Sequence, residues 1–162
     1  AVDFKGVELG NPLRFSAERS VFGALDCNPM KLEPEAYQNY LLALQQVDPG
    51  VRKVCNGSTS IAAVPADVTV VLGNSRRVLR LTFQFAGEDY LQVFTAMMDK
   101  WGDGIVEIRD EHDKSAWWDF DDGSSVSVHL MPDADASTST GRKVSIGLAE
   151  YALSLTTPAG DL

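Results

Sequence analysis

The two histidines and two cysteines are the residues that could carry enzyme chemistry in this chain. Nucleophilic catalysis needs a serine or cysteine beside a base, which is commonly a histidine. His112 and His129 are the only histidines, and no G-x-S-x-G elbow is present. A dyad of Cys27 or Cys55 with either histidine stays open, but a disulfide between the cysteines would remove both thiols. We therefore predict no catalytic residues, and a binding protein ranks ahead of an enzyme.

Carboxylates raise the question of a metal site or of glycoside hydrolysis. Residues 119–123 hold three aspartates and a glycine, but an EF-hand loop needs glycine at its sixth position and glutamate at its twelfth. Here the glycine is fifth and the twelfth residue is Leu130. Asp110, Asp119 and Asp121 could supply a carboxylate pair, although any acidic chain offers such pairs. Phosphate-binding glycine motifs are also missing. We expect no bound metal and no cofactor.

The chain has two cysteines, Cys27 and Cys55, and this even number permits one disulfide. Both lie beside turn-forming residues, which favours a Cys27–Cys55 bond over two reduced thiols or one reactive thiol. In the loop-entropy model such a bond contributes roughly 3–4 kcal/mol. It would place the protein in an oxidising compartment, periplasmic or secreted. The start at Ala1 is what signal-peptide cleavage would leave, although a chain shortened by other means would start in the same way.

A tryptophan pair is the most distinctive candidate for binding. Trp117 and Trp118 are consecutive in a predicted strand, so one of them must point away from the core. An outward tryptophan beside aspartates has the composition of a recognition patch, since tryptophan is enriched at interface hot spots. The alternative, to which we give equal weight, is that a helix or a loop covers the outward indole. The residues predicted to bind a partner are Trp117, Trp118, Asp119, Asp121, Asp122 and Asp110.

The composition narrows the classes of partner. The 162 residues are 44% hydrophobic and 23% charged, which is ordinary globular usage. The net charge of −9 argues against nucleic acid and anionic membranes, because both need clustered basic residues. No apolar run approaches the roughly 18 residues of a membrane span. The acidity fits either solubility alone or a basic protein partner.

Helix signals fall in three places. Asn11-Pro12 predicts a helix start and a short helix to Phe22, and a second helix is predicted from Pro34 to Val47. Glu88 to Trp101 has the clearest helical period and ends at Gly102. The stripe expected to pack on the sheet consists of Leu91, Phe94, Met98 and Trp101.

Strand signals occupy much of the remaining chain, and Gly73-Asn74-Ser75 predicts a hairpin. Pro132 to Gly141 is expected to be a polar loop, and a β-bulge near Ala149 would reconcile the two halves of the last strand. The predicted fold is one α+β domain over residues 1–162, with helices packed on one face of a mainly antiparallel sheet. The predicted strands are Thr59–Ala63, Asp67–Leu72, Val78–Phe85, Ile105–Arg109, Ala116–Phe120, Val126–Met131 and Val144–Leu155.

The opening Asp3-Phe4-Lys5-Gly6-Val7-Glu8-Leu9-Gly10, followed by a proline and then Cys27, resembles that of small secreted or periplasmic proteobacterial proteins of unknown function. These open with F-x-G-V-x-L-G, and their second cysteine begins the strands, as Cys55 does here. The phrase is distantly similar to openings of small envelope domains of the β-lactamase-inhibitor type. The resemblance implies a cell-envelope address and a helix-on-sheet fold, without catalytic residues. The chain departs from the pattern in its long segment Lys31 to Val54.

Three functions are compatible with these features. We expect first a non-enzymatic cell-envelope protein that binds another protein, such as an immunity protein or an inhibitor of a secreted toxin or hydrolase. The second is a small-molecule-binding or lipid-binding periplasmic domain, with a pocket between the sheet and the Glu88–Trp101 helix. The third is a hydrolase with a Cys–His or carboxylate pair. The oligomeric state is left open.

Overall fold

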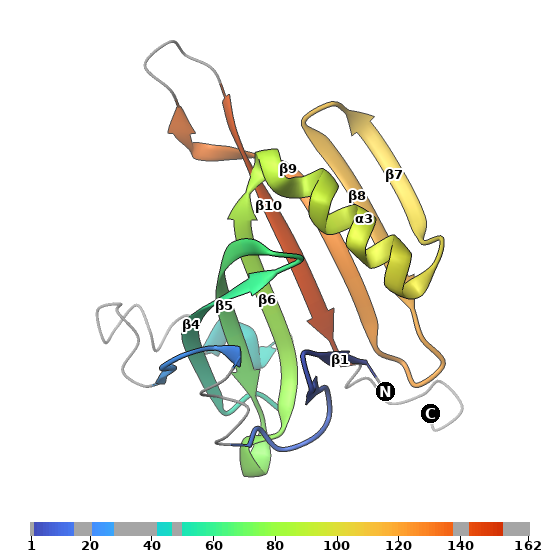
Figure 1. The fold of residues 1–162 in the computed structure, drawn as a ribbon. Coiled ribbons are helices and arrows are strands. Elements are labelled where there is room, and N and C mark those ends of the chain that lie inside the picture. The colour runs from blue at the N-terminus through green and yellow to red at the C-terminus, as the bar shows by residue number, and fades with distance from the viewer. Residues whose placement is uncertain (1, 15–20, 28–41, 47–49, 138–142, 154–162) are drawn as a thin grey trace.

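The computed structural model describes residues 2–14, 21–27, 42–46, 50–137 and 143–153. Most of them belong to one eight-stranded antiparallel sheet with the strand order β3-β4-β5-β6-β10-β9-β8-β7 (Figure 1). The chain therefore returns at its end to insert β10 between β6 and β9. The strands are β3 (Asp26–Cys27), β4 (Lys53–Ile61), β5 (Val64–Leu72), β6 (Val78–Ala86), β7 (Ile105–Asp110), β8 (Asp113–Asp119), β9 (Ser125–Ser137) and β10 (Lys143–Ala152).

The architecture is mainly β, which corrects the predicted α+β arrangement of several helices on a sheet. The one long helix among the described residues is α3 (Tyr90–Trp101), which crosses one face of the sheet between β6 and β7 (Figure 1). The predicted helix start at Asn11 is wrong, because Pro12 forms an isolated antiparallel bridge with Arg77. Helical residues 42–46 lie within the second predicted helix, and half of the first segment and most of the second fall outside the described residues.

Two sequence-based strand boundaries are also corrected. The segment predicted as a loop after Met131 is instead the continuation of β9 to Ser137, and residues 138–142 lie outside the described part. The register of β10 is unbroken from Ser145 to Ala152, so the predicted bulge near Ala149 is absent and the shift lies between Lys143 and Ser145. Ala149 itself is fully buried against the core.

Helix α3 covers the face of the sheet that we call the core face, and the opposite face is called the outer face. The buried residues of α3 are Tyr90, Val93 and Met97, whereas Leu91 is 68% exposed. The predicted stripe is therefore shifted, with Phe94, Met98 and Trp101 only partly buried at its margin. The apolar arc of this helix is wider than one stripe, so the period alone could not fix which residues face inward.

The opening motif folds as a small hairpin that also covers the core face. β1 (Asp3–Phe4) pairs with β2 (Val7–Glu8), and the turn between them places Lys5 and Gly6 at φ 49° and 86°. Glycine fits this left-handed conformation without a steric penalty. The Phe4 ring lies 4.5 Å from the Phe83 ring and 5.7 Å from the Tyr151 ring, measured between centroids. The motif therefore has a structural role, because its tight turn holds the Phe4 ring in the core.

A disulfide fastens β3 to the sheet. Cys27 and Cys55 are bonded and are also direct partners in the β3–β4 pairing, which confirms the predicted bond. Cys55 is completely buried, so the bond joins the edge segment to the core. Among the described residues, no helix is long and apolar enough to cross a membrane.

Candidate functional site

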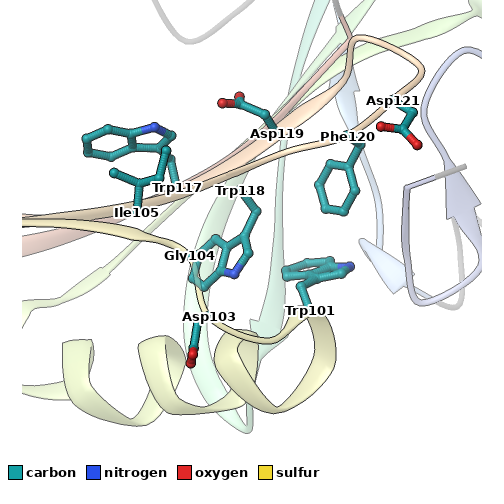
Figure 2. Close-up of a pocket in the computed structure, with 9 residues that line it drawn as sticks. All are labelled: Trp101, Asp103, Gly104, Ile105, Trp117, Trp118, Asp119, Phe120 and Asp121. Carbon is teal, nitrogen blue, oxygen red and sulfur yellow. The ribbon is translucent and has the colours of Figure 1, made fainter.

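The tryptophan pair is divided between the two faces of β8. Trp118 points to the core face, where it is 5% exposed and its Nε1–H donates a hydrogen bond to the Gly102 carbonyl oxygen at 2.9 Å. Trp117 points to the outer face, where it is half-buried opposite Ile105 of β7 (Figure 2). Alternation along the strand therefore makes Trp118 a core residue and places Trp117 on the outer face.

An open hollow of ≈490 Å³ surrounds this end of β8 (Figure 2). It forms where the connection from α3 to β7 meets the turn from β8 to β9, so residues distant in sequence share it. Four of the six predicted binding residues lie here, together with five that the sequence did not single out. The lining residues are Trp101, Asp103, Gly104, Ile105, Trp117, Trp118, Asp119, Phe120 and Asp121.

The charge of the hollow has one sign. Its ionisable lining residues are Asp103, Asp119 and Asp121, and all three are exposed. The potential here therefore attracts a cation, and the faces of aromatic rings attract cations as well. Within the part of the chain that the structure describes, the indole N–H of Trp117 donates no hydrogen bond. A ligand with a positive group and a hydrogen-bond acceptor would satisfy both features.

Gly104 explains how the connection to β7 can pass so close to the tryptophans. A Cβ atom at this position would lie 2.7 Å from Cε2 of Trp118 and 2.8 Å from the carbonyl oxygen of Trp117. Real Cβ atoms essentially never approach so closely, so only glycine fits. Gly102, at φ 80°, ends α3 just before it. The pair of glycines around Asp103 was the sequence signal that could have placed this segment in the site.

Two predicted binding residues lie elsewhere. Asp122 accepts a hydrogen bond from the Ser124 backbone N–H at 3.0 Å and another from the Ser124 hydroxyl. These bonds lower the pKa of the Asp122 carboxyl below its usual value. Asp110 is the last residue of β7, beside the β7–β8 turn, where it accepts a hydrogen bond from the His112 backbone N–H at 2.7 Å. Both aspartates stabilise turns and do not line the hollow.

The histidines do not form an evident catalytic site. His112 is exposed, and its Nε2 lies 3.4 Å from Oε1 of Glu111. His129 lies on the outer face, where Nδ1 is 3.0 Å from the Ser115 hydroxyl, a contact that the sequence did not predict. In the described segments, no third group orients His129 as a catalytic base requires. The disulfide removes both thiols from any Cys–His dyad.

A metal centre has no support in the described ranges, where no group of three or more His, Cys, Asp or Glu residues is placed to hold an ion.

Comparisons of the chain with protein-family models, with curated proteins and with solved structures found no match. The site must therefore be interpreted from its own geometry and charge.

Proposed function

We propose that this protein is a non-enzymatic binding module of the cell envelope. It docks a basic segment of another protein at the hollow lined by Trp117, Asp103, Asp119 and Asp121, which we call the Trp117 hollow. One observation carries the proposal: a half-buried tryptophan, whose indole N–H has no acceptor among the described residues, lies in a hollow whose ionisable lining residues are all aspartates. A lysine or arginine side chain of the partner would meet the Trp117 ring and the carboxylates of Asp119 and Asp121. Rings and carboxylates both favour such a cation.

The envelope address is supported by the disulfide, since such bonds persist in oxidising compartments. The role of an immunity protein or inhibitor is supported by the net charge of −9, which would speed association with a cationic toxin or hydrolase. Electrostatic attraction of this kind acts on the association rate and weakens with salt. Binding should therefore fall as ionic strength rises.

The alternative of a small-molecule or lipid pocket between the sheet and α3 has weaker support. The hollow beside α3 measures ≈150 Å³ and is bordered by Val93, Met97 and Tyr151. Ligand pockets ordinarily have volumes of about 300–1,000 Å³. The buried face of α3 is committed to the core, which leaves little room for a second ligand there.

The test is affinity capture with the purified protein from envelope and secreted proteins of its own source, followed by titration of the partner obtained. Trp117→Ala and the double variant D119N/D121N should each weaken binding at least tenfold. The control D110N/E111Q removes two charges from the β7–β8 turn and should bind as the wild type does. Failure to obtain a partner, or equal affinity of all four proteins, would overturn the proposal.

A further inference from the structure

The edge strand β7 is a second candidate surface for an interaction with a partner. Every residue of β7 is exposed, and among the residues that the structure describes β8 is its only neighbour in the sheet. Three of the five exposed large hydrophobic residues among the described ones lie on this strand: Ile105 at 56%, Val106 at 48% and Ile108 at 65%. An edge strand offers unpaired N–H and C=O groups to another strand.

Several of the protective features that keep such edges apart are missing from β7. Natural edges are blunted by charged side chains, above all lysine, and by proline, shortness or bulges. β7 has six residues without lysine or proline, and its one register shift lies near its end, between Ile108 and Asp110. The opposite edge of the sheet differs, because β3 has two residues and is tied down by the disulfide.

The charges of β7 are self-complementary in one register. We propose that β7 pairs antiparallel with β7 of a second copy of this chain, with Ile108 of each copy on the two-fold axis. This register places Glu107 opposite Arg109 of the second copy, twice. A two-fold axis at Glu107 or at Arg109 would instead oppose two like charges, which is destabilising. Charge complementarity therefore selects the second copy and also the register.

The side chains needed for this pairing are available. Nε of Arg109 lies 3.3 Å from Oε1 of Glu107, so the two side chains share a face of the sheet, and they are 69% and 53% exposed. Arg109 also lies 3.8 Å from a carboxylate oxygen of Asp113. Exposed ion pairs of this kind contribute little to stability. The dimer exchanges two such pairs, one within each chain, for two pairs between the chains, and this exchange therefore costs little.

The dimer is independent of the proposed function and would make it bivalent. A two-fold axis perpendicular to the sheet keeps the outer faces of both copies on the same side. With strands about 4.8 Å apart and residues about 3.4 Å apart along each strand, the two Trp117 Cα atoms would be about 25 Å apart. Both hollows would stay open, because β7 pairs through its backbone edge.

The experiment is a charge reversal followed by sedimentation velocity over a concentration series. The contact is small, so the wild type should dimerise with a dissociation constant in the micromolar range or weaker. E107R and R109E should each weaken the dimer at least tenfold, since each sets like charges opposite one another. The double variant E107R/R109E should restore the dimer to within about threefold of the wild type.

The control is Leu91→Lys, which removes an exposed apolar residue of α3 and should leave the dimer unchanged. Circular dichroism of each variant separates loss of pairing from loss of fold. Three results would overturn the proposal: a wild type that stays monomeric at the highest concentration, a dimer that tolerates E107R, or a double variant that stays monomeric. None of these variants changes a charge of the Trp117 hollow, so the proposed function would fail or succeed separately.

Discussion

The β4–β6 side of the sheet is buried along its core face and also at one end of its outer face, whereas β7 at the opposite side is exposed along its whole length. Beneath β5 and β6 the outer face carries its own apolar cluster of Val51, Val54, Val71 and Leu79. On the core face, the ring centroids of Phe83 and Tyr151 lie 5.5 Å apart. β7 has no buried residue at all. The comparison indicates that one side of the sheet supplies stability and the other is available for binding.

Trp118 and Trp101 join the two regions. Their ring centroids are 6.0 Å apart, and Trp101 also lies 5.6 Å from the Tyr151 ring. The aromatic core therefore extends from the packed side to the back of the Trp117 hollow. The hollow therefore has a packed rear wall and an exposed front, so the proposed docking would order few further side chains.

Removing a large side chain from each side would test the comparison most strongly. Phe83 is completely buried, so Phe83→Ala should destabilise the protein by about 3–5 kcal/mol. Ile108→Ala on β7 should cost less than about 1 kcal/mol, because Ile108 is 65% exposed. Urea unfolding measures both. Similar losses from the two variants would show that β7 contributes to the core.

Breaking the disulfide is expected to have the next largest effect. The double variant C27S/C55S frees the loop between the two positions in the unfolded chain, and we expect a loss of about 3–4 kcal/mol. Unfolding of the wild type under reducing conditions should give the same loss. A change below about 1 kcal/mol in both measurements would contradict the view that this bond secures the packed side.

Gly104 should matter more for stability than Trp117 does, although both border the hollow. Gly104→Ala forces its new methyl group against the Trp118 indole, at an expected cost of about 1–3 kcal/mol. Trp117→Ala should change stability by less than about 1 kcal/mol, since its ring lies on the outer face. Thermal unfolding distinguishes the two. The reverse order would place Trp117 within the core.

The smallest expected effect is a pH dependence located on the packed side. Burial, and then the negative charge of Asp3, raise the pKa of the Tyr151 phenol above its ordinary value of 10.0. Because the pKa of this phenol is higher in the folded than in the unfolded state, its contribution to the free energy of unfolding is complete below pH 10 and is lost as the pH rises further. The slope should reach about 1.4 kcal/mol per pH unit.

Tyr151→Phe supplies the control for that slope. Phenylalanine cannot ionise, so urea unfolding of this variant between pH 9.5 and about 11.5 should show a shallower decline than the wild type. Burial also raises the pKa of Tyr90, so some slope should remain. An identical decline in both proteins would mean that Tyr151 ionises freely in the folded state.

The alternation of side chains along a strand predicted which residues share a face. The alternation in β6 correctly placed Leu81, Phe83 and Phe85 in the core, and the alternation in β8 separated Trp117 from Trp118. These predictions succeed because successive side chains of any regular strand point to opposite faces. Strict alternation would also place Leu79 on the core face, but Leu79 packs in the outer cluster, because the β5–β6 register shifts beside it.

Pro65 shows where local signals mislead. Pro65 falls between the predicted strands Thr59–Ala63 and Asp67–Leu72, yet β5 includes it. Pro65 pairs with Ser60 of β4, and the pairing with β6 begins only at Asp67, so the absent donor faces no neighbouring strand. Proline is tolerated at such positions. The sequence could not reveal this, because it does not say which strands are neighbours.

The sequence by itself determined the disulfide partners, most strands, the acidic charge and the fact that one of the two tryptophans faces outward. The tertiary structure alone decided the insertion of β10 beside β6, the face that α3 buries, and the meeting of Asp103 and Ile105 with Trp117. The first set depends on residue type and on a period of two along a strand. The second depends on contacts between distant segments, and many registers and helix phases are compatible with the same local pattern.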